Sequence, residues 1–168
     1  MHRSERQREI FVMRAGYSRF IMAGLFLAGA IAAQADRYVV EPGTPGGTDT
    51  GLFDDWTCAA TQIQWAVDAA ENDETVWISN GDYVLTNPVT VDRNISLVGT
   101  GGVAVVDGDG QYRCFYFSQT ATGALENLFI TRGYCDGEGG GVWMSNGLVQ
   151  KCTFSNNTAT SHGGGLST

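Results

Sequence analysis

Few side chains in this sequence have the type and spacing that proton transfer or nucleophilic catalysis requires. Histidine is the side chain best suited to proton transfer at neutral pH, and the sequence holds two, His2 and His162. His162 has no Ser or Cys partner in a pattern typical of a nucleophile and its base. We therefore expect His162 to be an exposed turn residue, and the sequence predicts no catalytic residue.

Two short acidic stretches are the candidates for a metal site. Asp107-Gly108-Asp109-Gly110 resembles part of a calcium loop, but the further oxygen ligand and the later Glu of an EF-hand are not at the required spacing. Asp136 and Glu138 precede a glycine triplet and could bind a cation beside it. Because Asp and Gly also form tight turns, we expect structural turns at both places. The sequence thus predicts no metal-binding or cofactor-binding residue, with calcium as a weak alternative.

Basic side chains are scarce after residue 35, and none lies in a recognisable catalytic pattern. Proton abstraction beside a carbonyl would need a basic side chain opposite a calcium-binding group, and the best available set is Arg132 or Lys151 near Asp136. We expect Arg132 and Lys151 to lie on a solvated outer face instead. The basic residues are Arg37, Arg93, Arg113, Arg132 and Lys151.

Cysteines and tryptophans are the remaining side chains with distinctive chemistry. The even cysteine count permits disulfides in an oxidising compartment, with three possible connectivities. The sequence contains no C-x-x-C pair, so a zinc site has no support. Trp65 and Trp77 are expected to pack near a capping helix. Trp143 alternates outward from Val142, so it either stacks on a sugar ring or is partly covered by a loop. The cysteines are Cys58, Cys114, Cys135 and Cys152, and Cys152 is expected to behave as a small buried hydrophobe.

The first 35 residues have the three parts of a secretory signal peptide. Five arginines precede or border an apolar run, Phe20–Ala33, which ends in the small-x-small pattern Ala33-Gln34-Ala35. The run is shorter than the roughly 20 residues that a membrane-spanning helix needs. The sequence predicts a cleaved signal peptide over 1–35, and the alternative is a buried helix or a membrane anchor.

The chain that follows this leader is strongly acidic. The whole sequence has a formal charge of −8, and removal of the leader, with its five Arg and two Glu, brings the formal charge to −11. Such a surface repels phosphate backbones and anionic lipid, so we expect no nucleic-acid partner.

Turn-forming and helix-forming patterns come before any strand. Residues 36–57 are rich in Pro, Gly and Asp and are expected to form an extended lead-in segment. Residues 58–72 are expected to form an amphipathic helix, because Ile63, Ala66, Val67 and Ala70 fall on a single apolar stripe.

From residue 73 onward, short β-rich runs alternate with Gly, Asn and Asp, and an internal repeat organises them. Gly123–Met144 aligns without a gap on Gly147–Thr168, at an offset of 24 residues. A repeat this short cannot bury its own apolar face, so its copies must stack into coils. Stacking at about 4.8 Å places Ile130 against Phe154 and Leu128 against Cys152 inside the coil, with Phe129 pointing outward. The alternative is a β-sandwich that contains a duplicated hairpin.

Two stretches carry a family resemblance. Ala60–Leu85, with its Ile-Gln-Trp-Ala helix pattern and its Asn-Gly-Asp-Tyr turn, resembles the opening of pectate-lyase-like β-helix proteins. The Gly139–Val142, Phe154–Asn157 and Gly163–Leu166 motifs are similar to the GGA-I and F-x-x-N repeats of polymorphic outer-membrane proteins, with Gly in place of Ala. The resemblance implies an all-β, right-handed parallel β-helix over 73–168, with a capping helix at its N-terminal end. We expect the coil to be truncated at Thr168.

We therefore expect an exported extracellular or outer-membrane surface protein with an adhesive, structural or carbohydrate-contacting role and no enzymatic one. The expected partners are extracellular polysaccharide or a cell-surface protein, with membrane association only through a missing C-terminal region. The alternative is the N-terminal fragment of an extracellular polysaccharide lyase or glycoside hydrolase whose active site lies on missing coils.

Overall fold

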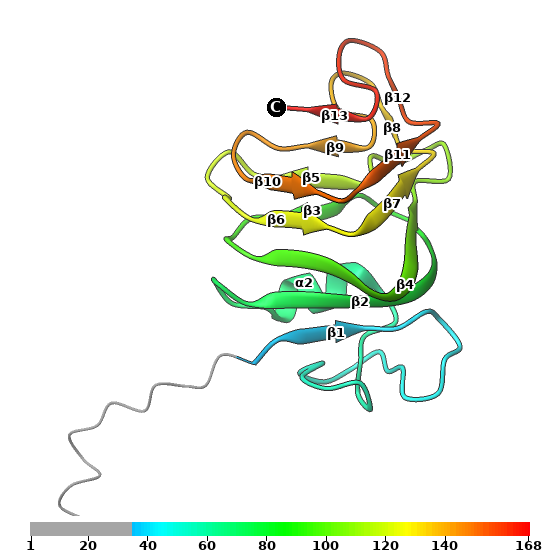
Figure 1. Ribbon diagram of the computed structural model, residues 1–168, viewed down its shortest axis with the longest axis vertical. Helices are drawn as coiled ribbons and strands as arrows, with labels where there is room; N and C mark the ends of the chain where they lie inside the picture. Colours follow the sequence, from blue (N-terminus) through cyan, green and yellow to red (C-terminus); the bar gives the residue numbers. More distant parts are fainter. Residues whose placement is uncertain (1–34) are drawn as a thin grey trace, which may run out of the picture. The chain divides into compact units, whose positions relative to one another are not determined.

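The computed structural model describes residues 35–168, and these form a parallel β-solenoid (Figure 1). Every strand pair in this part of the chain is parallel, from the first pair at β1 to the last at β13. The all-β architecture of stacked coils is therefore confirmed. The predicted signal peptide lies outside the described residues, except for Ala35.

The largest sheet, sheet A, runs the length of the stack and contains seven strands. Its main path follows the order β1-β2-β4-β6-β10, and β7 and β11 continue the same coils beyond a corner. The strands are β1 Arg37–Val39, β2 Thr75–Val84, β4 Ser96–Asp107, β6 Ala124–Glu126, β7 Leu128–Thr131, β10 Leu148–Gln150 and β11 Thr153–Ser155.

Two smaller sheets complete each turn of the coil. Sheet B has the order β13-β9-β5-β3, and a two-stranded sheet joins β8 to β12. Figure 1 shows the strands of successive turns lying one above the next. The strands are β3 Val89–Val91, β5 Phe115–Phe117, β8 Tyr134–Cys135, β9 Val142–Trp143, β12 Thr158–Ala159 and β13 Leu166–Ser167.

The 24-residue repeat sets the register of the last two coils. Ile130 pairs with Phe154, as predicted, and Val142 pairs with Leu166. Ile130 is fully buried, whereas Phe154 in the last described coil is half-buried and packs against the core. Phe129, between Leu128 and Ile130, is half-buried on the other side of its strand.

Apolar side chains from successive coils fill the interior in stacked rows. Leu97 lies in register with Leu125, and Val106 with Ile130, and all four are fully buried. Full burial of a side chain of this size stabilises the fold by about 1.5–3 kcal/mol. The interior of the coil is therefore the principal source of its stability.

Left-handed backbone corners divide two β-rich runs of the repeat. The run Leu125–Thr131 is split at Asn127, with φ 56°, and the run Leu148–Phe154 is split at Lys151, with φ 54°. Asn127 and Lys151 occupy equivalent positions of the repeat, so the corner is repeated although glycine is absent from it. Asn tolerates this conformation better than most residues. Lys151 directly follows β10 and adopts the same conformation at the equivalent corner.

The helix, α2, is shorter than predicted and covers Ile63–Ala69. The preceding residues do not continue it, because Asp55 accepts hydrogen bonds from the Thr57 and Cys58 amides and Ala60 forms a parallel bridge with Val39. Local side-chain hydrogen bonds of this kind compete with helix formation. The predicted apolar stripe is confirmed, since Ile63, Ala66 and Val67 are buried.

α2 closes the edge of sheet B through one side chain. The carboxamide of Gln64 accepts a hydrogen bond from the Thr90 amide at 2.7 Å and donates to the Thr90 carbonyl at 3.1 Å. Gln64 therefore replaces the neighbouring strand that β3 lacks on this side. The carbonyls at the end of the helix accept hydrogen bonds from two arginines, Arg37 on Ala69 and Arg93 on Ala70.

The lead-in segment covers the corresponding edge of sheet A. It contains a strand that the sequence did not predict, β1. On the outer side of this strand, the Tyr38 amide donates to the Phe53 carbonyl and the Tyr38 carbonyl accepts from the Ala60 amide. The far end of the stack differs. Among the described residues, β10, β11 and β13 are each paired on one side only. No helix within 35–168 has the length and apolar character needed to cross a bilayer.

Candidate functional site

The outer face of sheet B carries an aromatic pair, Tyr116 on β5 and Trp143 on β9. Inward neighbours of both residues are fully buried, so these two side chains are the outward members of the alternation. Their rings are stacked with centroids 5.2 Å apart and planes 20° apart. The residues in register on either side are Thr90 and Ser167, which have short hydroxyl side chains. We call Tyr116 and Trp143 the aromatic ladder.

Arg113 lies beside the ladder, and the protein itself fixes its guanidinium group. The guanidinium carbon is 5.4 Å from the Tyr116 ring centroid, a cation–π distance. Nε donates to the Gly139 carbonyl at 2.8 Å, and Nη2 donates to the Glu138 carbonyl at 2.6 Å and to Cys135 Sγ at 2.7 Å. Arg113 therefore orients Tyr116 and the following glycine turn and does not project freely into solvent.

Glu138 and His162 lie near the top of the same face. Glu138 accepts a hydrogen bond from Ser167 at 3.3 Å and lies 3.6 Å from His162 Nδ1. Ser161 Oγ also contacts His162 Nδ1, at 2.7 Å. A Ser–His–carboxylate relay uses opposite ring nitrogens, so this group does not have the geometry of such a relay. His162 is an exposed turn residue, as predicted.

A groove of about 360 Å³ opens beside α2, at the edge of sheet B. Trp65, Leu85 and Pro88 form its apolar part, and Gln62, Thr86 and Asn87 contribute amide and hydroxyl groups to its lining. Among the described residues that line it, Asp68 is the only charged one. The groove therefore combines an aromatic surface with neutral hydrogen-bonding groups, a composition typical of small-ligand sites.

The stretch Asp107–Gly110, which resembles part of a calcium loop, forms a turn that binds an arginine. Asp107 accepts hydrogen bonds from Arg132 at 2.5–2.9 Å, and Asp109 lies 3.5 Å from the same guanidinium group. Asp107 also caps the Asp109 amide at 2.8 Å. The expectation of a structural turn is confirmed.

The two basic residues of the alternative set, Arg132 and Lys151, bind acidic side chains other than Asp136. Arg132 is paired with Asp107, and Lys151 Nζ lies 2.7 Å from Glu126 Oε1. Asp136 accepts a hydrogen bond from Thr160 instead. The hydrogen bond from Lys151 lowers the pKa of Glu126, with a smaller contribution from Gln150. These contacts join residues one coil apart, which is why the linear sequence did not reveal them.

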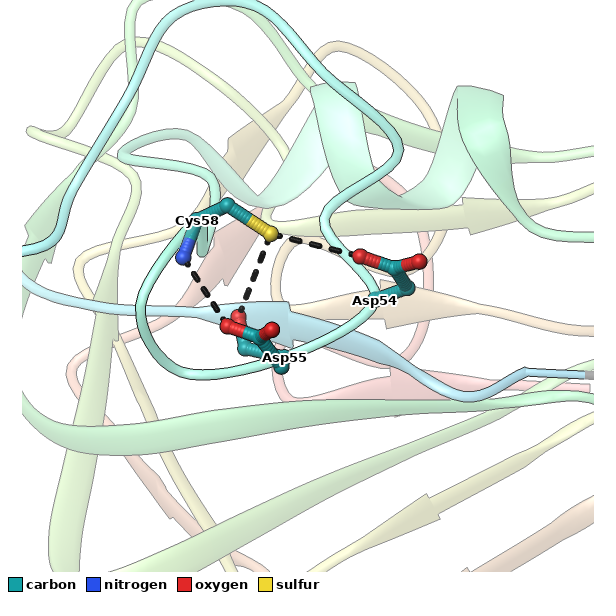
Figure 2. A group of neighbouring side chains, drawn as sticks. All are labelled: Asp54, Asp55 and Cys58. Carbon is teal, nitrogen blue, oxygen red and sulfur yellow. Dashed lines mark hydrogen bonds between the residues drawn. The ribbon is translucent and has the colours of Figure 1, made fainter.

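Asp54, Asp55 and Cys58 form an exposed cluster whose ligand atoms lie within 4.8 Å of one another (Figure 2). Asp55 Oδ1 accepts hydrogen bonds from Thr57 Oγ1 and from the Thr57 and Cys58 amides, and the hydrogen bond from the Thr57 hydroxyl is the largest cause of its lowered pKa. Cys58 Sγ donates to Asp54 at 3.3 Å. Because turn formation accounts for these contacts, we assign no metal to the cluster.

All four cysteines in the described residues are free thiols. Cys114 is fully buried, and this burial raises the pKa of its thiol to about 12. Burial also raises the pKa of Cys152, which packs half-buried against the core as the small hydrophobe that the sequence predicted.

Comparison with family models, with curated proteins and with solved structures finds no match to this chain. The aromatic ladder is therefore described from its own geometry. Sequence analysis singled out Trp143 but missed Tyr116 and Arg113, because Tyr116 precedes the aligned repeat. The Phe-Tyr-Phe alternation at 115–117 is the signal that identifies Tyr116 as an outward residue.

Proposed function

We propose that this chain is an exported β-solenoid module that contacts carbohydrate without catalysing a reaction. The stacked pair of Tyr116 and Trp143 on the outer face of sheet B is the observation that supports this proposal. Aromatic side chains present a large apolar surface with a polar edge, which suits the mixed faces of a sugar ring. Thr90 and Ser167, in register on either side, add hydroxyl groups that exchange hydrogen bonds with sugar hydroxyls.

The relationship to the repeats of polymorphic outer-membrane proteins is part of the same proposal. The Asn of the F-x-x-N motif, Asn157, donates to the Ile130 carbonyl at 2.9 Å and accepts from the Gly133 amide at 2.7 Å. In the glycine triplet, a β-carbon on Gly140 would lie 2.1 Å from the Thr158 carbonyl oxygen. Both motifs therefore join one coil to the next, and this structural role supports the resemblance.

Export is proposed from the basic start, the apolar core and the small-x-small exit of the first 35 residues. Sequencing the N-terminus of protein collected outside the cell is expected to give Asp36 as the first residue. Retention of the segment Phe20–Ala33 in that material would contradict the proposal.

The carbohydrate proposal is tested by replacing the ladder. Trp143→Ala and Tyr116→Ala are expected to weaken binding of the full chain to soluble polysaccharides, measured by affinity electrophoresis and by the change in tryptophan fluorescence. Trp56→Ala is the matched control, because Trp56 is 41% exposed and packs edge-to-face on Tyr38 away from sheet B. Equal binding by all three variants, or binding of no polysaccharide by the parent chain, would contradict the proposal.

A further inference from the structure

We infer that the polysaccharide bound at the aromatic ladder is neutral and not a uronic-acid polymer. This inference rests on the proposed function and names its ligand class. It follows from how the described part of the chain uses its positive charges, from the net field around the ladder and from the lining of the groove beside α2.

Binding an acidic polysaccharide directly requires cations that are free to meet its carboxylates. In residues 35–168, each basic side chain outside the ladder region is already paired with an acidic one. The pairs are Arg37 with Glu74 at 3.2 Å, Arg93 with Asp92 at 2.8 Å, Arg132 with Asp107 at 2.5 Å and Lys151 with Glu126 at 2.7 Å.

Among the described residues, Arg113 is the basic residue that contacts the ladder, and the protein itself holds two of its guanidinium nitrogens. Two backbone carbonyls and the Cys135 thiol accept from its Nε and Nη2 atoms. A carboxylate of a bound glycan that took Nε or Nη2 would have to displace these contacts, and with them the turn that holds Glu138 and Gly139. These two donors therefore serve to position Tyr116 and the turn.

The field around the ladder also disfavours an anionic polymer. The chain after residue 35 has sixteen acidic and five basic residues, and one of the acidic residues, Glu138, lies next to Ser167 at the top of the ladder. This excess of acidic side chains makes the electrostatic potential of the surface negative, and a negative potential repels anionic ligands. A polyuronate would be repelled along its length, whereas a neutral glycan would not.

The groove beside α2 presents the same chemistry at the foot of sheet B. In the part of the chain that the structure describes, its polar lining consists of neutral amides and hydroxyls, including Gln62, Thr86 and Asn87, and of one charged residue, Asp68. Neutral groups that both donate and accept match sugar hydroxyls, which do the same. The ladder and the groove thus favour one ligand class.

The experiment uses the full chain and a matched pair of probes, polygalacturonate and the same polymer with its carboxyl groups methyl-esterified, together with neutral galactan and glucomannan. Affinity electrophoresis and tryptophan fluorescence are measured at low and high salt, with calcium and with a chelator. We expect at least one neutral polymer to bind at least about tenfold more tightly than polygalacturonate, with little dependence on salt. Trp143→Ala is expected to weaken this binding.

Glu126→Gln is the charge control, because it releases Lys151 and leaves the ladder untouched. This variant is expected to gain weak, salt-sensitive binding of polygalacturonate while keeping its neutral ligand. Tighter binding of polygalacturonate by the parent chain, with or without calcium, would overturn the inference and leave the carbohydrate proposal standing. Binding of none of the polymers would instead overturn the carbohydrate proposal itself, and ultraviolet-absorbing unsaturated products would show a lyase.

Discussion

A β-carbon on Gly141 would lie 2.4 Å from the carbonyl oxygen of Gly165, whereas a β-carbon on Gly165 would approach no atom closer than 3.3 Å. The two glycines are equivalent in the repeat, so they form a matched pair. Gly141→Ala is expected to lower the free energy of unfolding by about 1–3 kcal/mol, because backbone must move to admit the methyl group. Gly165→Ala is expected to cost less than half as much in urea unfolding. Equal costs would contradict the close packing of these coils.

The side chain of Gln64 is expected to matter more than its position on a short helix suggests. Gln64→Ala removes two hydrogen bonds to Thr90 and is expected to cost about 1–3 kcal/mol. Gln62→Ala is the control, because Gln62 is exposed and makes no capping hydrogen bond. Hydrogen exchange at the Thr90 amide should accelerate in the first variant and stay unchanged in the second.

Adjacent residues on β7 should differ sharply in their tolerance of charge. Ile130→Asp places an unpaired carboxylate in the fully buried interior and is expected to prevent folding, at a cost of several kcal/mol. Phe129→Asp, on the outer side, is expected to leave a folded protein by circular dichroism. If both variants unfold, or neither does, the assigned faces of β7 are wrong.

The free energy of unfolding is expected to decrease as the pH rises above 9, because the thiol of Cys114 is buried. Burial raises the pKa of this thiol from its ordinary 9.0 to about 12, so the unfolded chain loses its proton first and stability declines from pH 9 to pH 12. The slope is at most about 1.4 kcal/mol per pH unit.

Cys114→Ala isolates this contribution. Tyr83, whose pKa burial raises from 10.0 to about 12, adds its own decline only above pH 10. Between pH 9 and 10, the free energy of unfolding of the variant should therefore depend less on pH than that of the parent. An identical slope for the two proteins in this interval would contradict the assigned burial of the thiol.

The repeat predicted the later coils well because identical spacing requires identical register. The alignment alone gave the pairs Ile130 with Phe154 and Val142 with Leu166. The earlier coils have no such constant spacing. The register shifts within one strand pair, between Ser79 and Gly81, so no single offset describes β2 and β4.

Contacts between coils explain what the sequence did not reveal. Arg132 and Lys151 are exposed, as expected, and each also binds an acidic residue of the preceding coil, a contact that the sequence did not reveal. The start of α2 was misplaced because the Asp55 turn and the bridge of Ala60 to Val39 compete with the helix. Tyr116 was missed because its stacking partner lies one coil further along. Each of these features depends on which residues the coil places one above another.

The end of the stack that carries α2 is protected against edge-to-edge association. Gln64 holds the amide and the carbonyl of Thr90 on β3, and Phe53 and Ala60 hold those of Tyr38 on the outer side of β1. An incoming strand would find these backbone groups already hydrogen-bonded. The helix and the lead-in segment therefore keep this end of the coil from pairing with a second copy of itself.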